Sequence, residues 1–149
     1  MTKKITIAID AMGGDNSPDK TIEGVGLFLE KRKNDNDFLL NLFGDEEKIK
    51  EKLIKYNIPT NKIQITHTTS TVSDEETPLT AVKNSKNTSM WNSIRSQIDG
   101  DSDISLSAGN TGVLLVISRM ILKMMNKVNK PALAGLWPSQ KGTSVVLDL

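Results

Sequence analysis

The chain has 149 residues, of which 19 are basic and 18 acidic, so its formal net charge is +1 and it lacks the basic excess typical of nucleic-acid-binding proteins. The absence of cysteine excludes disulfides and thiolate zinc sites, and a single histidine argues against a histidine-rich metal site. No apolar run approaches the roughly 20 residues of a membrane-spanning helix, so we expect a cytoplasmic protein. The length suits one domain, and we expect neither a metal nor a cofactor.

The N-terminal part of the chain alternates apolar runs with helical patterns. Residues 5–10 form a near-continuous apolar run, which is typical of a strand in a sheet covered on both faces. A helix is expected after the glycines that follow, with Ser17 as its N-cap and Pro18 as its first residue. The apolar face of this helix comprises Ile22, Val25, Gly26 and Leu29.

A second and a third strand are expected next. Residues 38–43 predict a strand, and Asp45 is placed to cap the helix that follows it. Residues 63–67 predict another strand, residues 68–76 a polar loop, and Thr77 the start of a short helix. The inner face of the helix capped by Asp45 is expected to comprise Ile49, Leu53 and Ile54.

The rest of the chain continues the alternation. A helix is expected over residues 88–98, with Trp91, Ile94 and Ile98 on one side, and a strand over residues 103–106. A glycine-bearing turn then leads into a helix that ends at about Asn126. This helix is apolar on nearly every side, so we expect it to be buried on more than one side. The last two predicted strands comprise residues 132–137 and 144–149.

This order of elements predicts an α/β fold, a three-layer α/β/α, Rossmann-like arrangement with a mostly parallel sheet. In such sheets ligands bind outside the carboxyl ends of the strands, where turns follow Asp10 and Leu106. The last predicted strand has no loop behind it, and the apolar helix lacks covering partners. We therefore expect residues 1–149 to be the N-terminal α/β part of a larger protein, inactive on its own.

The turn after Asp10 has features of an anion site. Gly13 and Gly14 allow a ligand to approach the backbone closely, and the next helix begins with N–H groups that lack intrahelical partners. The alternative interpretation is a plain strand-to-helix turn without a ligand.

The turn at residues 107–112 is richer in hydrogen-bond donors. The hydroxyls of Ser107 and Thr111, the amide of Asn110 and the N–H groups around Gly109 converge before a helix. Such a cluster suits phosphate or a developing oxyanion. The alternative is again an ordinary turn, in which Asn110 serves only as the helix cap.

Both turns resemble motifs of one enzyme family. Ile-Asp-Ala-Met-Gly-Gly-Asp-Asn-Ser-Pro at residues 9–18 resembles the N-terminal signature of the PlsX-type phosphate acyltransferases, and Ser-Ala-Gly-Asn-Thr-Gly at residues 107–112 resembles their second signature. The resemblance covers the whole chain. Further segments that match in order comprise residues 81–83, 86–90, 130–133 and 145–149.

The resemblance implies transfer of an acyl group from acylated acyl carrier protein to inorganic phosphate, in fatty acid and phospholipid synthesis. Phosphate is already an anionic nucleophile near neutral pH, so positioning and oxyanion stabilisation matter more than a strong base. Asp10 and Asp15 are interpreted as residues that hold the first turn. The implied catalytic residues are Asp10, Ser107 and Asn110, and the implied phosphate-binding residues are Gly13, Gly14, Asp15, Asn16, Gly109 and Thr111.

The resemblance also implies a homodimer of the complete protein and peripheral association with the inner face of the membrane through a second half. Three alternatives remain open: a phosphotransacetylase-like enzyme that uses acyl-CoA, a dinucleotide-binding dehydrogenase, and an inactive truncated product. The dehydrogenase has little support because the chain lacks a GxGxxG motif.

Overall fold

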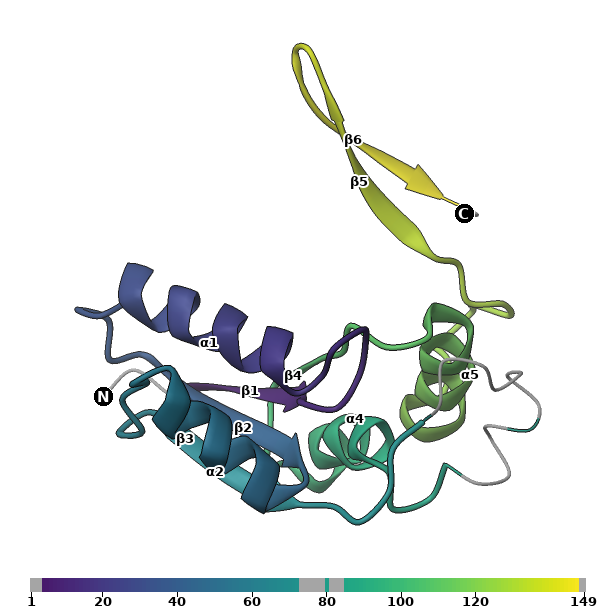
Figure 1. Ribbon diagram of the computed structural model, residues 1–149. Helices are drawn as coiled ribbons and strands as arrows, with labels where there is room; N and C mark the ends of the chain where they lie inside the picture. Colours follow the sequence, from purple (N-terminus) through teal and green to yellow (C-terminus); the bar gives the residue numbers. More distant parts are fainter. Residues whose placement is uncertain (1–3, 73–79, 81–84, 148–149) are drawn as a thin grey trace.

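A parallel sheet of four strands organises the fold in the computed structural model, which describes residues 4–72, 80 and 85–147 (Figure 1). The strand order is β3-β2-β1-β4, and every neighbouring pair is parallel. The prediction of a parallel α/β sheet is therefore confirmed. The strands are β1 (Ile5–Asp10), β2 (Phe38–Gly44), β3 (Ile63–His67) and β4 (Ile104–Leu106).

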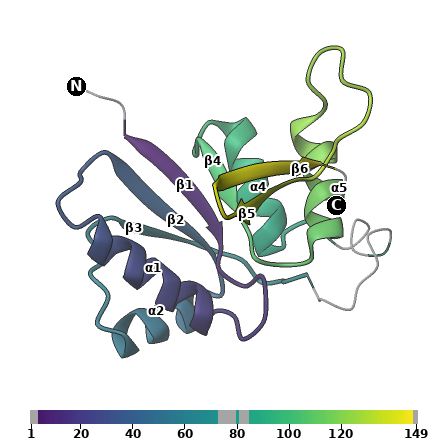
Figure 2. The ribbon, with the colours of Figure 1, turned by 90° about the horizontal axis from the view of Figure 1, so that it is seen from above.

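Helices cover both faces of this sheet, as expected for a three-layer α/β/α fold. Figure 2 shows α1 and α2 on one side of the strands and α4 and α5 on the other. The helix expected from Thr77 lies outside the described residues. The helices are α1 (Asp19–Lys31), α2 (Glu46–Lys55), α4 (Ser89–Asp99) and α5 (Thr111–Leu122).

Two hydrophobic clusters hold these layers together. The larger one lies between the sheet and the helices α1 and α2, and it includes Ile9, Ile22, Leu40, Leu42 and Ile49. The smaller one joins α4 to α5. It comprises the buried side chains of Met90, Ile94, Val113, Ile117 and Ile121.

The strand order creates a topological switch point beside β1. The chain adds β2 and β3 on one side of β1 and then returns to place β4 on the other side. Ile7 pairs with Ile104, and Ile9 pairs with Leu106, so both strands end at the same level. Open α/β sheets bind ligands outside the carboxyl ends of strands at such a point.

The strands β5 (Ala134–Ser139) and β6 (Gly142–Leu147) pair only with each other among the described residues, as an antiparallel hairpin. The hairpin projects away from the sheet (Figure 1). Its large apolar side chains are therefore exposed, namely Leu136, Trp137, Val145 and Leu147. Within the described part of the chain, no helix combines the length and the hydropathy needed to cross a bilayer.

Two sequence-based expectations for the first helices are wrong. The helix α1 begins at Asp19, and Ser17 does not cap it. The Ser17 hydroxyl instead donates to the carbonyl of Gly13, which closes the preceding turn. In α2 the buried face consists of Ile49 and Leu53, whereas Ile54 is 76% exposed because it lies about 100° further around the helix, beyond the sheet.

One expectation for α5 is also wrong. The helix ends at Leu122 rather than near Asn126, because Lys123 has a φ of 64°, in the left-handed region that stops a helix. Within this chain α5 is buried along the side that faces α4, and Met120 is 51% exposed, in agreement with the expectation that this apolar helix lacks covering partners. Ile98, which the pattern placed on the same side of α4 as Ile94, is exposed.

A polar cluster joins the start of α1 to the end of α2. The Asp19 carboxylate accepts hydrogen bonds from the Tyr56 hydroxyl at 2.5 Å and the Lys55 ammonium at 3.1 Å, and it pairs with Lys52 at 2.9 Å. The hydrogen bond from Tyr56, followed by those from Lys52 and Lys55, holds the pKa of Asp19 well below its ordinary value.

Replacing Asp19 with Asn should therefore destabilise the full-length protein in a pH-dependent way. A carboxyl whose pKa is lower in the folded state stabilises the fold above its unfolded pKa, and this contribution disappears as the pH falls through the folded value. The urea midpoint of Asp19→Asn should lie below that of the wild type at pH 7. The difference between the two midpoints should become smaller below about pH 4.

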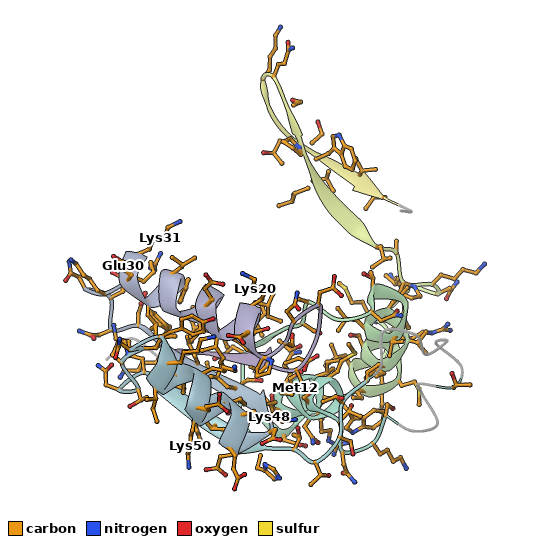
Figure 3. All side chains as sticks on the ribbon, viewed as in Figure 1. Met12, Lys20, Glu30, Lys31, Lys48 and Lys50 are labelled. Carbon is orange, nitrogen blue, oxygen red and sulfur yellow. The ribbon has the colours of Figure 1, made fainter. Side chains whose placement is uncertain are left out.

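The matched control is Glu30→Gln, at the exposed far end of the same helix (Figure 3). It should leave the urea midpoint nearly unchanged, because exposed polar replacements cost little. A constant gap between Asp19→Asn and the wild type from pH 3 to pH 7 would contradict the role assigned to this cluster.

Candidate active site

The turns that follow β1 and β4 touch each other at the switch point. The Ser107 hydroxyl donates a hydrogen bond to Asp10 Oδ2 at 2.7 Å, and the Gly109 N–H donates to Ser107 Oγ at 3.1 Å. The other carboxyl oxygen of Asp10 accepts from the N–H of Met12 at 3.2 Å. Asp10 is only 2% exposed, so this chain of hydrogen bonds satisfies a carboxyl that would be costly to bury alone.

Gly13 and Gly14 make this contact between the turns possible. A Cβ on Gly13 would lie 2.5 Å from Asp10 Oδ2, 2.8 Å from Ser107 Oγ and 2.9 Å from the Gly109 nitrogen. Gly14 has a φ of +89°, and a Cβ there would lie 2.7 Å from the Ala108 carbonyl oxygen. The sequence suggested that these glycines admit a ligand, whereas in the structure they already admit the second turn.

Asn110 connects the second turn to α5. Its side-chain oxygen accepts a hydrogen bond from the N–H of Val113 at 3.1 Å, so Asn110 is the N-cap of α5. This cap fixes the direction in which α5 leaves the turn. The first N–H groups of the helix, beginning at Thr111, consequently face the space outside the carboxyl ends of β1 and β4.

A cavity of about 400 Å³ lies at this position. None of its described lining residues is basic, so any attraction for an anion must come from backbone N–H groups and from the positive end of the α5 dipole. The lining comprises Gly14 and Asp15 from the first turn and Ala108, Gly109, Asn110, Thr111 and Gly112 from the second.

The structure thus groups most of the predicted site residues. Asp10, Gly13, Ser107 and Gly109 are linked by the contacts between the turns, and Gly14, Asp15, Asn110 and Thr111 line the cavity. Asn16 differs, because it is exposed and is not among the described lining residues. Its φ of 58° places it in the bend of the first turn.

His67 lies at the end of β3 and contacts the start of α2. His67 Nδ1 accepts a hydrogen bond at 3.3 Å from the N–H of Glu46, the first residue of α2, which gives this histidine a structural role. The described residues contain no group of three or more His, Cys, Asp or Glu side chains arranged to hold a metal ion.

A larger cavity of about 490 Å³ adjoins the first one and shares Gly14, Asp15 and Ala108 with it. Sequence reasoning missed this cavity, which lies along α1. The signal was present in α1 and the turn before it, because Ser17, Thr21, Gly24 and Phe28 recur at helical spacing on one side. The short side chains of Ser17, Thr21 and Gly24 beside an apolar strand leave such a space, which reaches Phe28.

Gly13→Ala tests whether the close contact between the turns supports the fold. The added methyl group would overlap Asp10, Ser107 and Gly109, so the turns must separate. We expect the free energy of unfolding of the full-length protein to fall by about 1–3 kcal/mol, which is typical of overpacking.

Gly100→Ala is a suitable comparison for this variant. Gly100 ends α4 with a φ of +82°, which Gly13 does not share, and a Cβ there would meet nothing within 4 Å. Gly100→Ala therefore reports the cost of a strained backbone, and Gly13→Ala reports the cost of the clash. If Gly13→Ala left the free energy of unfolding unchanged, the contact between the turns would not matter for stability.

Comparisons with known proteins agree on one family. The sequence model of the family "Fatty acid synthesis protein" matches residues 5–149. The phosphate acyltransferases of Pelagibacter ubique and Parvibaculum lavamentivorans are 50% and 42% identical to this chain over its whole length. The chain spans only 43% and 41% of those two proteins.

The fold of this chain is also found among solved structures. The EutD phosphotransacetylase from Staphylococcus aureus aligns with 97% of this chain and 46% of its own, with a TM-score of 0.58. The sequence identity is 15%, so this likeness concerns the fold alone.

Proposed function

Because this chain belongs to the fatty acid synthesis protein family, we propose that it supplies part of the active site of a phosphate acyltransferase. The acyl donor is the thioester of acyl carrier protein, and the acceptor is inorganic phosphate. A phosphate oxygen attacks the carbonyl carbon, a C–O bond forms and the C–S bond breaks. The sulfur leaves with the bonding electrons and takes up a proton, which yields acyl phosphate and free carrier thiol.

The observation that carries this proposal is the meeting of two donor-bearing turns at the switch point. Asp10 and Ser107 act as positioning residues, because their hydrogen bond joins the turns. Phosphate binds in the adjoining cavity, against the backbone N–H groups of Thr111 and Gly112 at the start of α5. Gly109 lines the same cavity, but its N–H is engaged by Ser107 Oγ, so it contributes a close approach of the backbone. The Asn110 amide then lies beside the oxyanion that develops on the thioester carbonyl.

The proposed mechanism assigns no general base to this chain. Asp10 accepts hydrogen bonds from Ser107 and Met12 and is buried, so it is poorly placed to take a proton from phosphate. Phosphate brings its own negative charge near neutral pH. The rate enhancement must come from orientation of the two reactants and from stabilisation of the oxyanion.

We extend the proposal to the whole protein. Residues 1–149 would form the N-terminal α/β part of a cytoplasmic enzyme of phospholipid synthesis that works as a homodimer and associates peripherally with the membrane. The exposed apolar side chains of the β5–β6 hairpin, including Leu136, Trp137 and Val145, support an interface with another part of the complete assembly.

The direct test of this function is release of carrier thiol by the full-length protein. Palmitoyl-acyl carrier protein should release thiol only when phosphate is present, and acyl phosphate should appear in equal amount. Palmitoyl-CoA is the comparison donor. Faster turnover of the CoA thioester would favour a phosphotransacetylase-like enzyme, and no turnover of either donor would reject the proposal.

Variants of Asn110 separate its two roles. Asn110→Ser keeps a side-chain oxygen that can cap α5 but removes the amide, whereas Asn110→Ala removes both. We expect kcat to fall by about 100-fold or more in both variants, as for loss of one oxyanion donor. Only Asn110→Ala should also lose about 1 kcal/mol of stability.

The measurements are steady-state kinetics and urea unfolding of the same preparations. Asn110→Ser with wild-type turnover would show that Asn110 is only a helix cap. A large loss of stability in Asn110→Ser would instead mean that its slower turnover results from unfolding and not from the missing amide.

A further inference from the structure

A buried methionine lies directly beneath the second turn of the candidate active site. A Cβ added to Gly109 would lie 2.9 Å from Met90 Cε, so the backbone of Gly109 already rests against this terminal methyl group. The Met90 side chain is only 1% exposed. Both residues belong to this chain and meet in its interior, so no other part of the complete protein is needed to form the contact.

The capped start of α4 fixes the position of Met90. The Thr88 hydroxyl is the N-cap of this helix, because it accepts a hydrogen bond from the N–H of Trp91 at 3.2 Å. The N–H of Ser89 donates to the carbonyl of Ser70 at 3.1 Å, which ties the helix to the segment after β3. Thr88 and Ser89 are themselves buried. These two hydrogen bonds hold the first turn of α4, and with it Met90, in place.

Met90 also belongs to the cluster that supports the start of α5. The helices α4 and α5 lie side by side (Figures 1 and 2), and Met90 and Val113 are members of the one buried cluster that joins them. The N–H of Val113 is the group that the Asn110 side chain caps at 3.1 Å. The buried side of the second turn is therefore supported at two points, by Met90 at Gly109 and by the cluster at Val113.

The shape of methionine suits this place. Its side chain is unbranched and its thioether is polarizable, so it fills irregular gaps between elements. Its terminal carbon lies one bond further from Cβ than the terminal carbons of leucine do. A shorter side chain at position 90 would leave a void beneath Gly109. Protein interiors relax only partly into such voids, and the second turn would lose a contact that holds it away from α4.

A shift of the second turn would move the groups that face the 400 Å³ cavity. Asn110, Thr111 and Gly112 follow Gly109 directly along the chain, and all of them line this cavity. Their N–H groups and the amide of Asn110 act on a bound anion only within hydrogen-bond distance. A misplacement of about 1 Å can cost about 100-fold at a reacting site.

We propose that Met90 is a positioning residue of the phosphate site. Its terminal methyl group sets the distance between the second turn and α4, and the turn thereby keeps its donors directed at the cavity. Met90 does not touch phosphate itself, because it is buried beneath Gly109 and is not among the described residues that line the cavity. This inference rests on the proposed function in taking phosphate as the ligand.

The experiment measures phosphate binding by the full-length protein in the absence of an acyl donor. Isothermal titration calorimetry with inorganic phosphate should give a dissociation constant at least about 10-fold higher for Met90→Ala than for the wild type. In assays of thiol release, the KM for phosphate should rise to a similar extent. The KM for palmitoyl-acyl carrier protein should change little, because the void opens beneath the phosphate-binding turn.

The matched control is Ile94→Ala, one turn further along α4. Ile94 is 1% exposed and belongs to the same cluster, but it does not supply any of the atoms nearest to Gly109. Both substitutions remove a large buried side chain, so both should destabilise the protein to a similar extent. Only Met90→Ala should raise the phosphate dissociation constant. If either variant does not fold, Met90→Leu and Ile94→Val decide, with a rise of about threefold or more expected for Met90→Leu alone.

A double variant tests the contact itself. Gly109→Ala places a methyl group 2.9 Å from Met90 Cε, so it should displace the turn and weaken phosphate binding. Met90→Ala makes room for that methyl group. The loss of affinity in the double variant should therefore be smaller than the product of the two single losses, by at least about threefold. Single losses that simply multiply would contradict the contact.

The outcomes separate this role from the proposed function. If the wild type releases thiol but Met90→Ala and Ile94→Ala bind phosphate equally well, the positioning role is overturned and the function stands. If the wild type releases no thiol but binds phosphate, and only Met90→Ala weakens that binding, the acyltransferase function is rejected and the positioning role at an anion site is supported. A wild-type protein that binds no phosphate would overturn both.

Discussion

The hydrogen bond between Ser107 and Asp10 is the contact on which the candidate site depends. It joins residues 97 positions apart in the chain and ties the ends of β1 and β4 into one surface. The Asp10 carboxyl is buried, and its hydrogen bonds from Ser107 and Met12 keep it satisfied. Without the Ser107 hydroxyl, one oxygen of a buried carboxyl would lose this donor and the turns would lose their link.

The topology explains why this contact occurs at that place. Parallel strands have their carboxyl ends at one edge of the sheet. The chain leaves β1 toward β2 on one side and later returns to place β4 on the other side, so the connections diverge at this point. Turns of unrelated sequence therefore meet there. The absence of side chains at Gly13 and Gly14 lets them approach within van der Waals contact.

The same arrangement places the two cavities side by side. The helix α1 leaves the first turn and runs back along β1, so its inward side continues from the site without a break. The two cavities meet at Gly14 and Ala108.

Much of this architecture follows from patterns in the sequence. The strands were predictable because their apolar runs are short and bounded by turn residues, and the parallel sheet followed from the alternation with helices. The grouping of the two glycine turns was predictable as well, because both follow strands of one parallel sheet. These inferences need only local periodicity and the geometry of the fold class.

Other features depend on contacts that a linear pattern does not contain. By its position in the sequence, the Ser17 hydroxyl could either cap α1 or donate a hydrogen bond within the preceding turn. Only the path of the turn selects the Gly13 carbonyl as its partner. The helical spacing of short side chains on α1 indicates one wall of the larger cavity, but the cavity also requires the position of β4 relative to α1, which no periodicity reveals. The exposure of Ile54 and Met120 likewise reflects which sides of α2 and α5 find a neighbour.

The most direct test of the account is a double-mutant cycle on Asp10 and Ser107 in the full-length protein. The variants are Asp10→Ala, Ser107→Ala and the combination, and the measured quantities are the free energy of unfolding and the affinity for phosphate. Groups that share one hydrogen bond should show a coupling of about 0.5–3 kcal/mol in stability, and each single variant should weaken phosphate binding nearly as much as the double. Additive effects on both quantities would show that the two turns act independently, which contradicts the account.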